Sequence, residues 1–578
     1  MSERRRGLLI IAAVAGSYVV LSILLTLPAW TAPSTTYIGE GPDPLQAIWA
    51  MGWVPFAVGH GLDPLVSYSM NSPTGFDLLW TQPSAIPVAV LWPVTALFGP
   101  VVTYNVVMTL SLALASCFAF LVIRRWVSGV VAAAIGGLVY GFSPYMTGQL
   151  LGHVNLVLAG VTPPLALMLL DEIVVRQRLR PRTLGVLTAL LAIVQFFIAQ
   201  EVLLTEIIAA AVVTAVLAVT HRSEVRARSH YVVQSLTYAV VPAVVVLAYP
   251  VWLQFFGVDH VVNSGAIHGT DVYVTDPANF VVPTVAQLIS PPVATAVSSH
   301  FTGNASEWDA YLGIPLILLL IVATVRFWRV PLVRTVAIVA VVFAVFSLGP
   351  HLNVQRHPLL VLPLPWWIPA HLPLLDDILP NRLMVYVDLA AAILVAFMLR
   401  ALWLLKSRPA LNVAVAVVAL FPLIPTLPAQ TTRLTVPPPF TSAHTASMFQ
   451  GANVLFEPFP SEDYPDAMIW QMSAGYSFSI VGGYTVGEPS KAAQDLQRRI
   501  YDLTAASSVM HLTAEDRSAL AADLCALSFA VVVVGSGATP GMESLFTQLL
   551  GAPPDRVDGL LVWKFLPFHC PARRDSDP

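Results

Sequence analysis

The residues best suited to chemistry begin with Asp43 and Glu40, the two carboxylates of an acidic segment, Gly39–Gln46, that is rich in glycine and proline. This segment comes just after the first long apolar stretch, Leu8–Trp30. A carboxylate held where a membrane helix meets the outer water is costly to keep there and usually serves a function. Such a group can accept the proton of an attacking hydroxyl. Asp43 is therefore the first candidate for a functional residue.

Asp43 also has a structural interpretation. An Asp-Pro pair is a good helix start, with the carboxylate as N-cap and proline at the first helical position. The same pair recurs at Asp63-Pro64 and Asp276-Pro277. The place of Asp43 after the first apolar stretch favours it over the other two. The two roles can coexist, because a capped carboxylate is well oriented.

The elements that position these residues follow from the composition. Hydrophobic residues make up 56% of the chain, charged residues make up 11%, and the mean hydropathy is +0.74. A soluble domain carries roughly 25% charged residues, so the composition indicates a polytopic membrane protein. Leu8–Trp30 is longer than the apolar core of a signal peptide and lacks a convincing cleavage site. We therefore expect it to be a retained first helix.

The apolar pattern predicts eleven membrane-spanning helices, since about 17 to 25 residues cross the hydrocarbon layer. Besides the first helix, the predicted spans are 101–123, 127–142, 156–172, 184–199, 202–219, 231–256, 310–325, 335–349, 385–404 and 410–428. Ser84–Phe98 is apolar but short, contains two prolines, and is expected to lie at the outer interface.

Counting positive residues fixes the predicted orientation. With Ser84–Phe98 at the interface, 17 Lys and Arg residues fall in the inner loops, while the outer loops before residue 430 hold only Arg356 and Arg382. Positive residues in short loops stay on the cytoplasmic side, so we expect the N-terminus inside and the C-terminus outside.

The expected fold is an all-α polytopic membrane domain at residues 1–428 with a small extracytoplasmic α/β domain at residues 429–578. Three long, acidic outer loops interrupt the membrane domain: 31–100, which carries interfacial helices, 257–309 and 350–384. Because the inner turns are short and the outer loops are elaborate, the pattern places binding or chemistry on the outer face.

The C-terminal domain has its own pattern of strands and helices. We predict strands at Val454–Pro458, Phe529–Val534 and Leu560–Phe565, and amphipathic helices at Lys491–Leu503 and Ala514–Leu527. In an exported compartment Cys525 and Cys570 form a disulfide or stay reduced and buried. The glycine-rich segment Gly535–Gly541 is interpreted as a strand-to-helix turn. Four aromatic residues of this domain either bind an acceptor glycan or form its core: Tyr464, Trp470, Tyr476 and Tyr484.

Four short motifs suggest a family. They are Gly41–Trp49, Asn71–Gly75, Phe142–Tyr145 with Gly152-His153, and Glu307 followed by Tyr311–Gly313. In their order along residues 1–405 they resemble an uncharacterised bacterial branch of the glycosyltransferase-C superfamily, whose enzymes use polyprenyl-phosphate sugars. In such inverting transfer a base takes the proton of an acceptor hydroxyl while the lipid phosphate leaves. The resemblance implies that the catalytic base is Asp43, with Glu40 as the substitute.

Two cationic or neutral donors are candidates for binding the substrate. Arg382, at the start of a predicted span, can hold the lipid phosphate bidentately. Its alternative role is an interfacial anchor that pairs with Asp376, Asp377 or Asp388. His153 can donate to the phosphate or to the sugar, or it is a hydrogen-bonded surface residue.

Three further acids are candidates for lining the substrate site. Glu201 lies at the outer end of a predicted span, and Glu206 lies inside that span, where a carboxylate should face a cavity or a partner rather than lipid. Glu206 lines a pocket or plays a structural role. Glu307 resembles an acid that some relatives place in a late outer loop, and its alternative is a solvated loop charge.

Metal use is left open by the sequence. Many relatives carry a second carboxylate in the next outer loop, but the corresponding segment here, Ser143–Asn155, has no acid. Asp43, Glu307 and His153 can still converge on a divalent metal, but their spacing does not show it. No other cofactor is expected.

The favoured function is an enzyme of the plasma membrane that transfers a hexose or pentose from a polyprenyl-phosphate donor to a cell-envelope glycan, lipid or protein. Membrane lipids are expected partners, and nucleic acid is not. The alternative is a non-catalytic membrane protein or transporter that handles envelope intermediates. The enzyme predicts an outward cavity with Asp43, Arg382 and His153 in its walls. The transporter predicts ionisable groups along a continuous path near the midplane.

Overall fold

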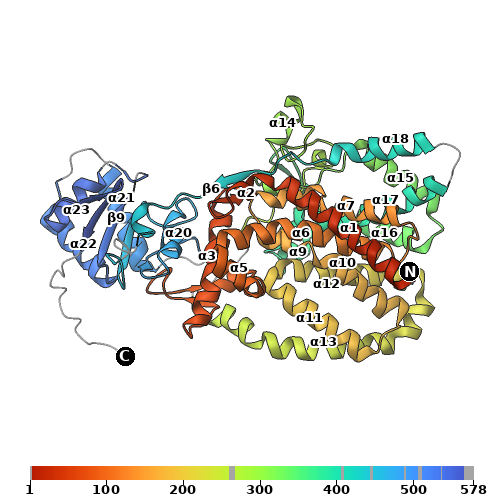
Figure 1. Cartoon of the computed structure of the whole chain (residues 1–578), viewed down its shortest axis with the longest axis horizontal. Coiled ribbons are helices and arrows are strands. Elements are labelled where there is room, and N and C mark those ends of the chain that lie inside the picture. Colours follow the sequence, from red (N-terminus) through yellow and green to blue (C-terminus); the bar gives the residue numbers. More distant parts are fainter. Residues whose placement is uncertain are drawn as a thin grey trace. The chain divides into compact units, whose positions relative to one another are not determined.

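The computed structural model describes residues 3–258, 267–404, 409–442, 447–486, 490–505, 511–535, 537–539 and 541–564. Its contacts divide the chain into two compact units. The membrane unit consists of Met1–Glu40, Tyr104–Ala248 and Asn263–Thr432, and the second unit of Gly41–Thr103, Tyr249–Val262 and Arg433–Pro578. Each unit is described by itself below, and Figure 1 labels many of the elements.

Among the described residues, seven helical stretches are long and apolar enough to cross a membrane. They are Arg5–Leu25 in α1 (Glu3–Leu25), α6 (Pro100–Ile123), Val154–Arg176, α11 (Pro181–Ile198), α12 (Gln200–Thr220), α13 (Arg222–Phe256) and Pro380–Leu404. The pair α7 (Val130–Gly141) and Pro144–Leu151, bent by 41°, adds an eighth candidate. The chain is therefore a multi-pass membrane protein.

Three stretches that we expected to span form shorter apolar helices. They are α15 (Ile314–Phe327), α16 (Pro331–Ser347) and α18 (Pro409–Leu420). The total of eleven spans and the orientation thus stay predictions. Ser84–Phe98 is broken into α4 (Ala85–Val88), a 3-10 turn and α5 (Trp92–Phe98), as its two prolines suggest.

Helix α17 (Met384–Leu404) is the central helix of the membrane unit, and most of its side chains are buried. It packs against α7, α15 and α16. Glycines on α7 permit this approach: a Cβ at Gly136 would lie 2.9 Å from the Ala392 carbonyl oxygen, and one at Gly137 would lie 2.5 Å from that of Ser116 on α6. Small residues are a usual way to bring membrane helices together.

The remaining elements of the membrane unit are short. They are α2 (Leu27–Thr31), β1 (Thr36–Ile38), α8 (Pro144–Gly148), α9 (Val154–Ala159), α10 (Thr162–Leu170), a π-helical turn (Asp171–Arg176), α14 (Pro292–Ser298), β4 (His351–Val354), β5 (His357–Pro363) and the 3-10 turns Gln149–Leu151, Pro277–Phe280, Ala305–Glu307, Pro365–Trp367, Pro369–His371, Pro380–Leu383 and Phe421–Leu423.

The second unit contains a five-stranded sheet with the strand order β10-β11-β9-β7-β8. Strand β7 (Asn453–Glu457) runs parallel to β8 (Ser479–Ile480) and β9 (Val531–Val534), whereas β11 (Leu560–Lys564) is antiparallel to β9 and β10 (Asp555–Val557). The α-helices of its C-terminal segment are α20 (Asp466–Ser473), α21 (Lys491–Ala505), α22 (Ala514–Ala526) and α23 (Met542–Leu550). The predicted strands and helices are confirmed within a few residues.

Strand β7 alternates its side chains between two apolar layers, as a buried strand must. Leu455 packs into a core with side chains of α21, α22 and α23. Phe456 faces the other layer, where Phe440 stacks on Trp470 with ring centroids 5.1 Å apart. Trp470 is thus a core residue, as the structural alternative predicted. Cys525 lies on α22, and Cys570 lies outside the described residues, so their pairing stays an expectation.

Helix α3 (Pro42–Gly59) belongs with the C-terminal residues of the second unit. The Trp49 indole N–H donates to Gln471 Oε1 at 2.9 Å, and the Tyr476 hydroxyl donates to the Trp49 carbonyl at 2.8 Å. Trp53 stacks on Trp49 and meets Tyr476 edge to face. These buried aromatic contacts tie a segment from the first predicted outer loop to the C-terminal domain.

Candidate functional site

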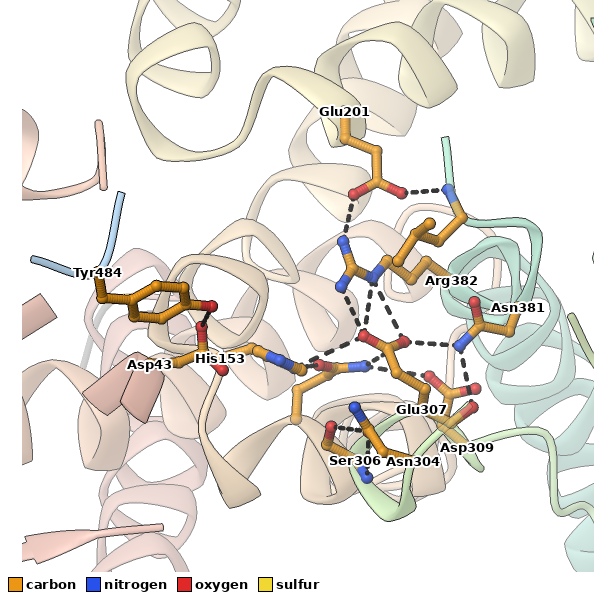
Figure 2. A network of polar contacts seen from close by, with 12 residues as sticks. Asp43, His153, Glu201, Asn304, Ser306, Glu307, Asp309, Asn381, Arg382 and Tyr484 are labelled. Carbon is orange, nitrogen blue, oxygen red and sulfur yellow. Dashed lines mark hydrogen bonds and ion pairs between the residues drawn. The ribbon is translucent and has the colours of Figure 1, made fainter. Parts of the chain in front are cut away.

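The centre of the site in the membrane unit is Arg382, whose guanidinium contacts two carboxylates (Figure 2). Its Nη1 lies 2.5 Å from Glu201 Oε2, and its Nη2 lies 2.5 Å from Glu307 Oε1. Nε adds contacts of 3.1 and 3.3 Å to the two oxygens of Glu307. The Arg382 side chain is 17% exposed and that of Glu307 only 2%. The ion pair between Arg382 and Glu307 is thus largely buried.

His153 and Gln149 form the second part of the site. His153 Nδ1 lies 2.6 Å from Gln149 Oε1 and 3.7 Å from Glu307 Oε1. The Gln149 amide nitrogen donates to Glu307 at 3.5 Å and to Asp309 at 3.3 Å. Gln149 thus links His153 to the two carboxyl groups.

Two residues that we did not single out complete the network. Asn381 donates to Glu307 Oε2 at 2.6 Å and to its carbonyl oxygen at 2.9 Å. Asp309 is 1% exposed, and its Oδ1 has no hydrogen-bond partner. Burial, together with Glu307 and Asp388, raises the pKa of Asp309 well above its usual value. Burial thus favours the protonated form of Asp309.

Local sequence explains how these side chains reach one place. Ser143 accepts a hydrogen bond from the Met146 N–H and Pro144 follows it, so a new helical turn begins after α7 and delivers Gln149. Asn304 caps the turn that ends at Glu307 by accepting from the Ser306 N–H. The Leu379 N–H donates to Glu201 Oε1 at 2.8 Å, which anchors the start of α12 beside the turn before α17.

The first outer-loop segment divides between the two units. Gly39 has φ +94°, and a Cβ there would lie 2.6 Å from the Leu151 carbonyl oxygen, so only glycine fits. Glu40 is exposed and accepts a hydrogen bond from the Gln430 side chain. Both residues belong to the membrane unit, whereas Asp43 belongs to the second unit. The structure therefore assigns the two candidate bases to different parts of the molecule.

Asp43 does not have the capping role that its Asp-Pro pair predicted. Helix α3 begins at Pro42 with Gly41 as N-cap and without a side-chain cap hydrogen bond. By contrast, Asp276 accepts from the Ala278 N–H, and Asp63 accepts from the Leu65 N–H. Asp43 lies in the first turn of its helix and accepts a hydrogen bond from the Tyr484 hydroxyl at 2.9 Å (Figure 2).

The sequence identified the charged members of the site but not their partners. Arg382 pairs with Glu201 and Glu307, rather than with an aspartate of its own segment, among the described ion pairs. Glu307 is buried, so a solvated loop charge is the wrong interpretation. In the part of the chain that the structure describes, no group of three His, Cys, Asp or Glu residues has the arrangement of a metal site.

Glu206 faces a cavity, one of the two roles that its sequence position predicted. The cavity has a volume of about 620 Å³ and lies among α10, α12, α13, α16 and α17. Tyr386, whose hydroxyl lies 2.8 Å from that of Thr205, also lines it. Most of the remaining lining is apolar, and Arg176, Arg178 and Arg228 contribute the positive charges.

Acid should destabilise the folded protein through Glu307. Burial alone would raise its pKa, but Arg382, His153 and Asn381 outweigh burial and lower it to about 2. The unfolded chain takes up this proton near pH 4.5, so acidification from about pH 4.5 to 2 favours unfolding by ~3 kcal/mol. Thermal unfolding in detergent across this range should show that loss in wild type, and Glu307→Gln should lack it. The exposed control Glu224→Gln should keep the wild-type slope, and equal slopes in all three proteins would contradict the prediction.

Comparisons with known proteins give a family. The model of the family described as "Domain of unknown function (DUF6311)" matches residues 13–420. The chain belongs to this family. The DUF6311 match includes Asp43 and every residue of the Arg382 network, and it ends before the C-terminal α/β domain. A search of curated proteins found no match.

Solved structures similar to this DUF6311 chain include AglB and ArnT. The archaeal oligosaccharyltransferase AglB of Archaeoglobus fulgidus, in complex with an inhibitory peptide and a dolichol-phosphate, has 11% identity and a TM-score of 0.49, over 93% of this chain and 70% of AglB. ArnT of Cupriavidus metallidurans in the apo state has 13% identity and a TM-score of 0.37, over 97% and 98% of the two chains. At these TM-scores neither similarity supports a functional argument.

Proposed function

We propose that this chain is a membrane glycosyltransferase of the glycosyltransferase-C type. It transfers a sugar from a polyprenyl-phosphate donor to a cell-envelope acceptor on the outer face of the plasma membrane. The observation that carries the proposal is a buried, charged network in the same unit as a large apolar cavity. A lipid-linked donor has the matching parts, a charged phosphate and a long hydrocarbon chain.

The cavity suits the hydrocarbon chain of such a donor. Along α12 it extends from Glu206 to Leu217, which is roughly 16 Å at the helical rise per residue. Glu201, the partner of Arg382, lies on the same helix, about a turn and a half before Glu206. Tyr386 lies one turn after Arg382 on the other wall. A phosphate beside Arg382 would thus have an apolar cavity nearby for its prenyl chain.

Arg382 and His153 are the proposed phosphate ligands. Each Nη of a guanidinium carries two hydrogens, and the carboxylates Glu201 and Glu307 take one from each. The second hydrogens can meet two phosphate oxygens in the bidentate geometry that arginine favours. The two carboxylates fix the position of the Arg382 guanidinium group. They also neutralise this buried cation before the donor binds.

The proposed reaction is a single displacement. The acceptor hydroxyl oxygen bonds to the anomeric carbon of the sugar, and the bond from that carbon to the phosphate oxygen breaks. The electron pair leaves with the lipid phosphate, where Arg382 stabilises the charge, and the hydroxyl proton passes to a base. Asp43 is the proposed base, because it follows the first predicted span and because its carboxylate, in the first turn of α3, can accept a proton.

Filling the cavity tests the proposal. Ala210 on α12 lines the cavity, whereas its neighbour Ala211 is exposed and does not. Full-length protein in lipid nanodiscs is incubated with polyprenyl-phosphate hexoses and pentoses and with envelope acceptors, and donor consumption is followed by mass spectrometry. We expect wild type and Ala211→Trp to consume a donor, and Ala210→Trp to lose at least about 10-fold in kcat/KM.

Two results would overturn the proposal. In one, folded wild-type protein binds lipid-linked sugars but consumes none, which favours the non-catalytic handling of envelope intermediates. In the other, Ala210→Trp and Ala211→Trp consume the donor at equal rates, and the cavity then does not hold the prenyl chain.

A further inference from the structure

The C-terminal α/β domain has a pocket of its own at the carboxyl ends of β7 and β9. Its volume is about 540 Å³. It is lined by the loop after β7, by α21 and by the turn between β9 and α23. Ligands of open α/β sheets bind outside the carboxyl ends of parallel strands, so this is the place where the topology favours a site.

Glu457, the last residue of β7, lines this pocket and has no structural task among the described contacts. The residue is 6% exposed, and its Oε1 has no hydrogen-bond partner. A buried polar atom without a partner calls for an explanation, and an absent ligand is one. Burial raises the pKa of Glu457 to about 8, so the carboxyl group is mainly protonated at neutral pH and can both donate and accept a hydrogen bond.

The rim of the pocket combines two kinds of group. Tyr464 and Tyr501 line it and are 47% and 63% exposed, which leaves ring surface in reach of a ligand. Gln497, Asp463 and Arg498 are exposed polar side chains on the same lining. Exposed tyrosines supply flat apolar faces, and planar amide, carboxylate and guanidinium groups hydrogen-bond to neighbouring hydroxyls.

The charges of the pocket select among ligand classes. Arg498 is the cationic side chain of the described lining and also lies 4.0 Å from Asp495. Asp463 contributes the opposite charge. An anion would face Asp463, and a metal ion would need more ligands than this lining offers. A neutral molecule with many hydroxyl groups and apolar ring faces fits both the tyrosines and the polar groups.

We infer that this pocket binds a neutral saccharide, with Tyr464 and Tyr501 against its ring faces and Glu457 hydrogen-bonded to a hydroxyl. The pocket lies wholly within the second unit, and saccharide binding there does not depend on the proposed transfer reaction. The turn between β9 and α23 already packs on the loop after β7: a Cβ at Gly537 would lie 3.2 Å from Pro458. The pocket is therefore preformed on this side.

The test measures binding with no donor lipid present. Fluorescently labelled oligosaccharides of glucose, mannose, galactose, arabinose, N-acetylglucosamine and glucuronic acid are titrated into full-length protein in nanodiscs by microscale thermophoresis. We expect at least one neutral oligosaccharide to bind, and Tyr501→Ala and Gln497→Ala each to weaken it at least about 5-fold. Both residues are exposed, so these variants should fold. The matched control is Tyr68→Ala, which removes an exposed tyrosine of the same unit outside the pocket.

Three outcomes would overturn the inference. They are the absence of binding by every neutral oligosaccharide at millimolar concentration, binding of glucuronic acid oligomers alone, and equal binding by Tyr501→Ala and Tyr68→Ala. Because no sugar is transferred in this assay, failure here leaves the proposed enzyme untouched. Failure of the donor assay likewise leaves the saccharide site standing.

Discussion

Replacing Arg382 by leucine should abolish sugar transfer and lower the stability of the folded protein. The change leaves Glu201 and Glu307 buried without their cation. Breaking a buried ion pair in this way costs about 3–5 kcal/mol. Loss of the guanidinium group that stabilises the leaving phosphate should lower kcat by about 10²–10³-fold, which is the effect of removing one preorganised hydrogen-bond donor to a transition state. Thermal unfolding and donor consumption in nanodiscs measure the two effects.

A lysine variant separates the two roles of Arg382. Arg382→Lys keeps the positive charge beside both glutamates, so most of the stability should return. Its ammonium lacks the planar fork, so transfer should stay at least about 10-fold below wild type. Arg356→Ala is the control, since Arg356 donates to the Phe301 and Ser299 carbonyl oxygens in another loop. Wild-type activity in Arg382→Lys would refute bidentate phosphate binding.

Much of the fold was predictable because its causes are local. The alternation around Leu455 and the apolar run Val531–Val534 predicted the neighbouring strands β7 and β9 of the five-stranded sheet. Arg125 and Arg176, placed on the same side of the membrane by their charge, meet at Asp171 in the membrane unit, with distances of 3.0 and 2.5 Å. Hydrophobic periodicity and the distribution of positive charge are properties of single segments, so the sequence of each segment is enough to detect them.

The partners within the site could not be predicted, because they come from distant segments. Glu307 and Arg382 were singled out separately, and nothing in their spacing shows that they touch. Gln149, Asn381 and Asp309 were missed. The available signals were weak: Gln149 lies four residues before His153, and Asp309 lies two residues after Glu307. Such spacings place side chains near one another only when the local backbone is known.

The assignment of residues 41–103 to the second unit was also beyond the sequence. Hydropathy describes this segment only as a loop between two apolar stretches. Its place depends on specific contacts, such as that of Trp49 with Gln471, which lie more than 400 residues apart. Single aromatic residues in a polar loop give no indication of the element on which they pack.

Asp43→Asn should stop transfer while leaving the fold and donor binding intact. Asparagine has the shape of aspartate and can still accept the hydrogen bond from the Tyr484 hydroxyl, but it cannot take up a proton. General base catalysis contributes typically 10²–10⁴-fold, so kcat should fall by about that factor. The midpoint of thermal unfolding should change little, because asparagine keeps the shape of aspartate and the hydrogen bond from Tyr484. Donor turnover and donor binding, measured on the same nanodisc preparation, separate the chemical step from substrate recognition.

Another Asp-Pro pair supplies a matched control. Asp63→Asn keeps an oxygen that can accept from the Leu65 N–H, so this variant should transfer sugar at close to the wild-type rate. Tyr484→Phe removes the hydroxyl that donates to Asp43 and should lower kcat less than Asp43→Asn does, because it disturbs the orientation of the carboxylate and leaves its basicity available. Turnover by Asp43→Asn at the rate of the Asp63→Asn control would remove Asp43 from the mechanism. The base would then have to be sought among the acids of the membrane unit, beginning with Glu40, which is exposed.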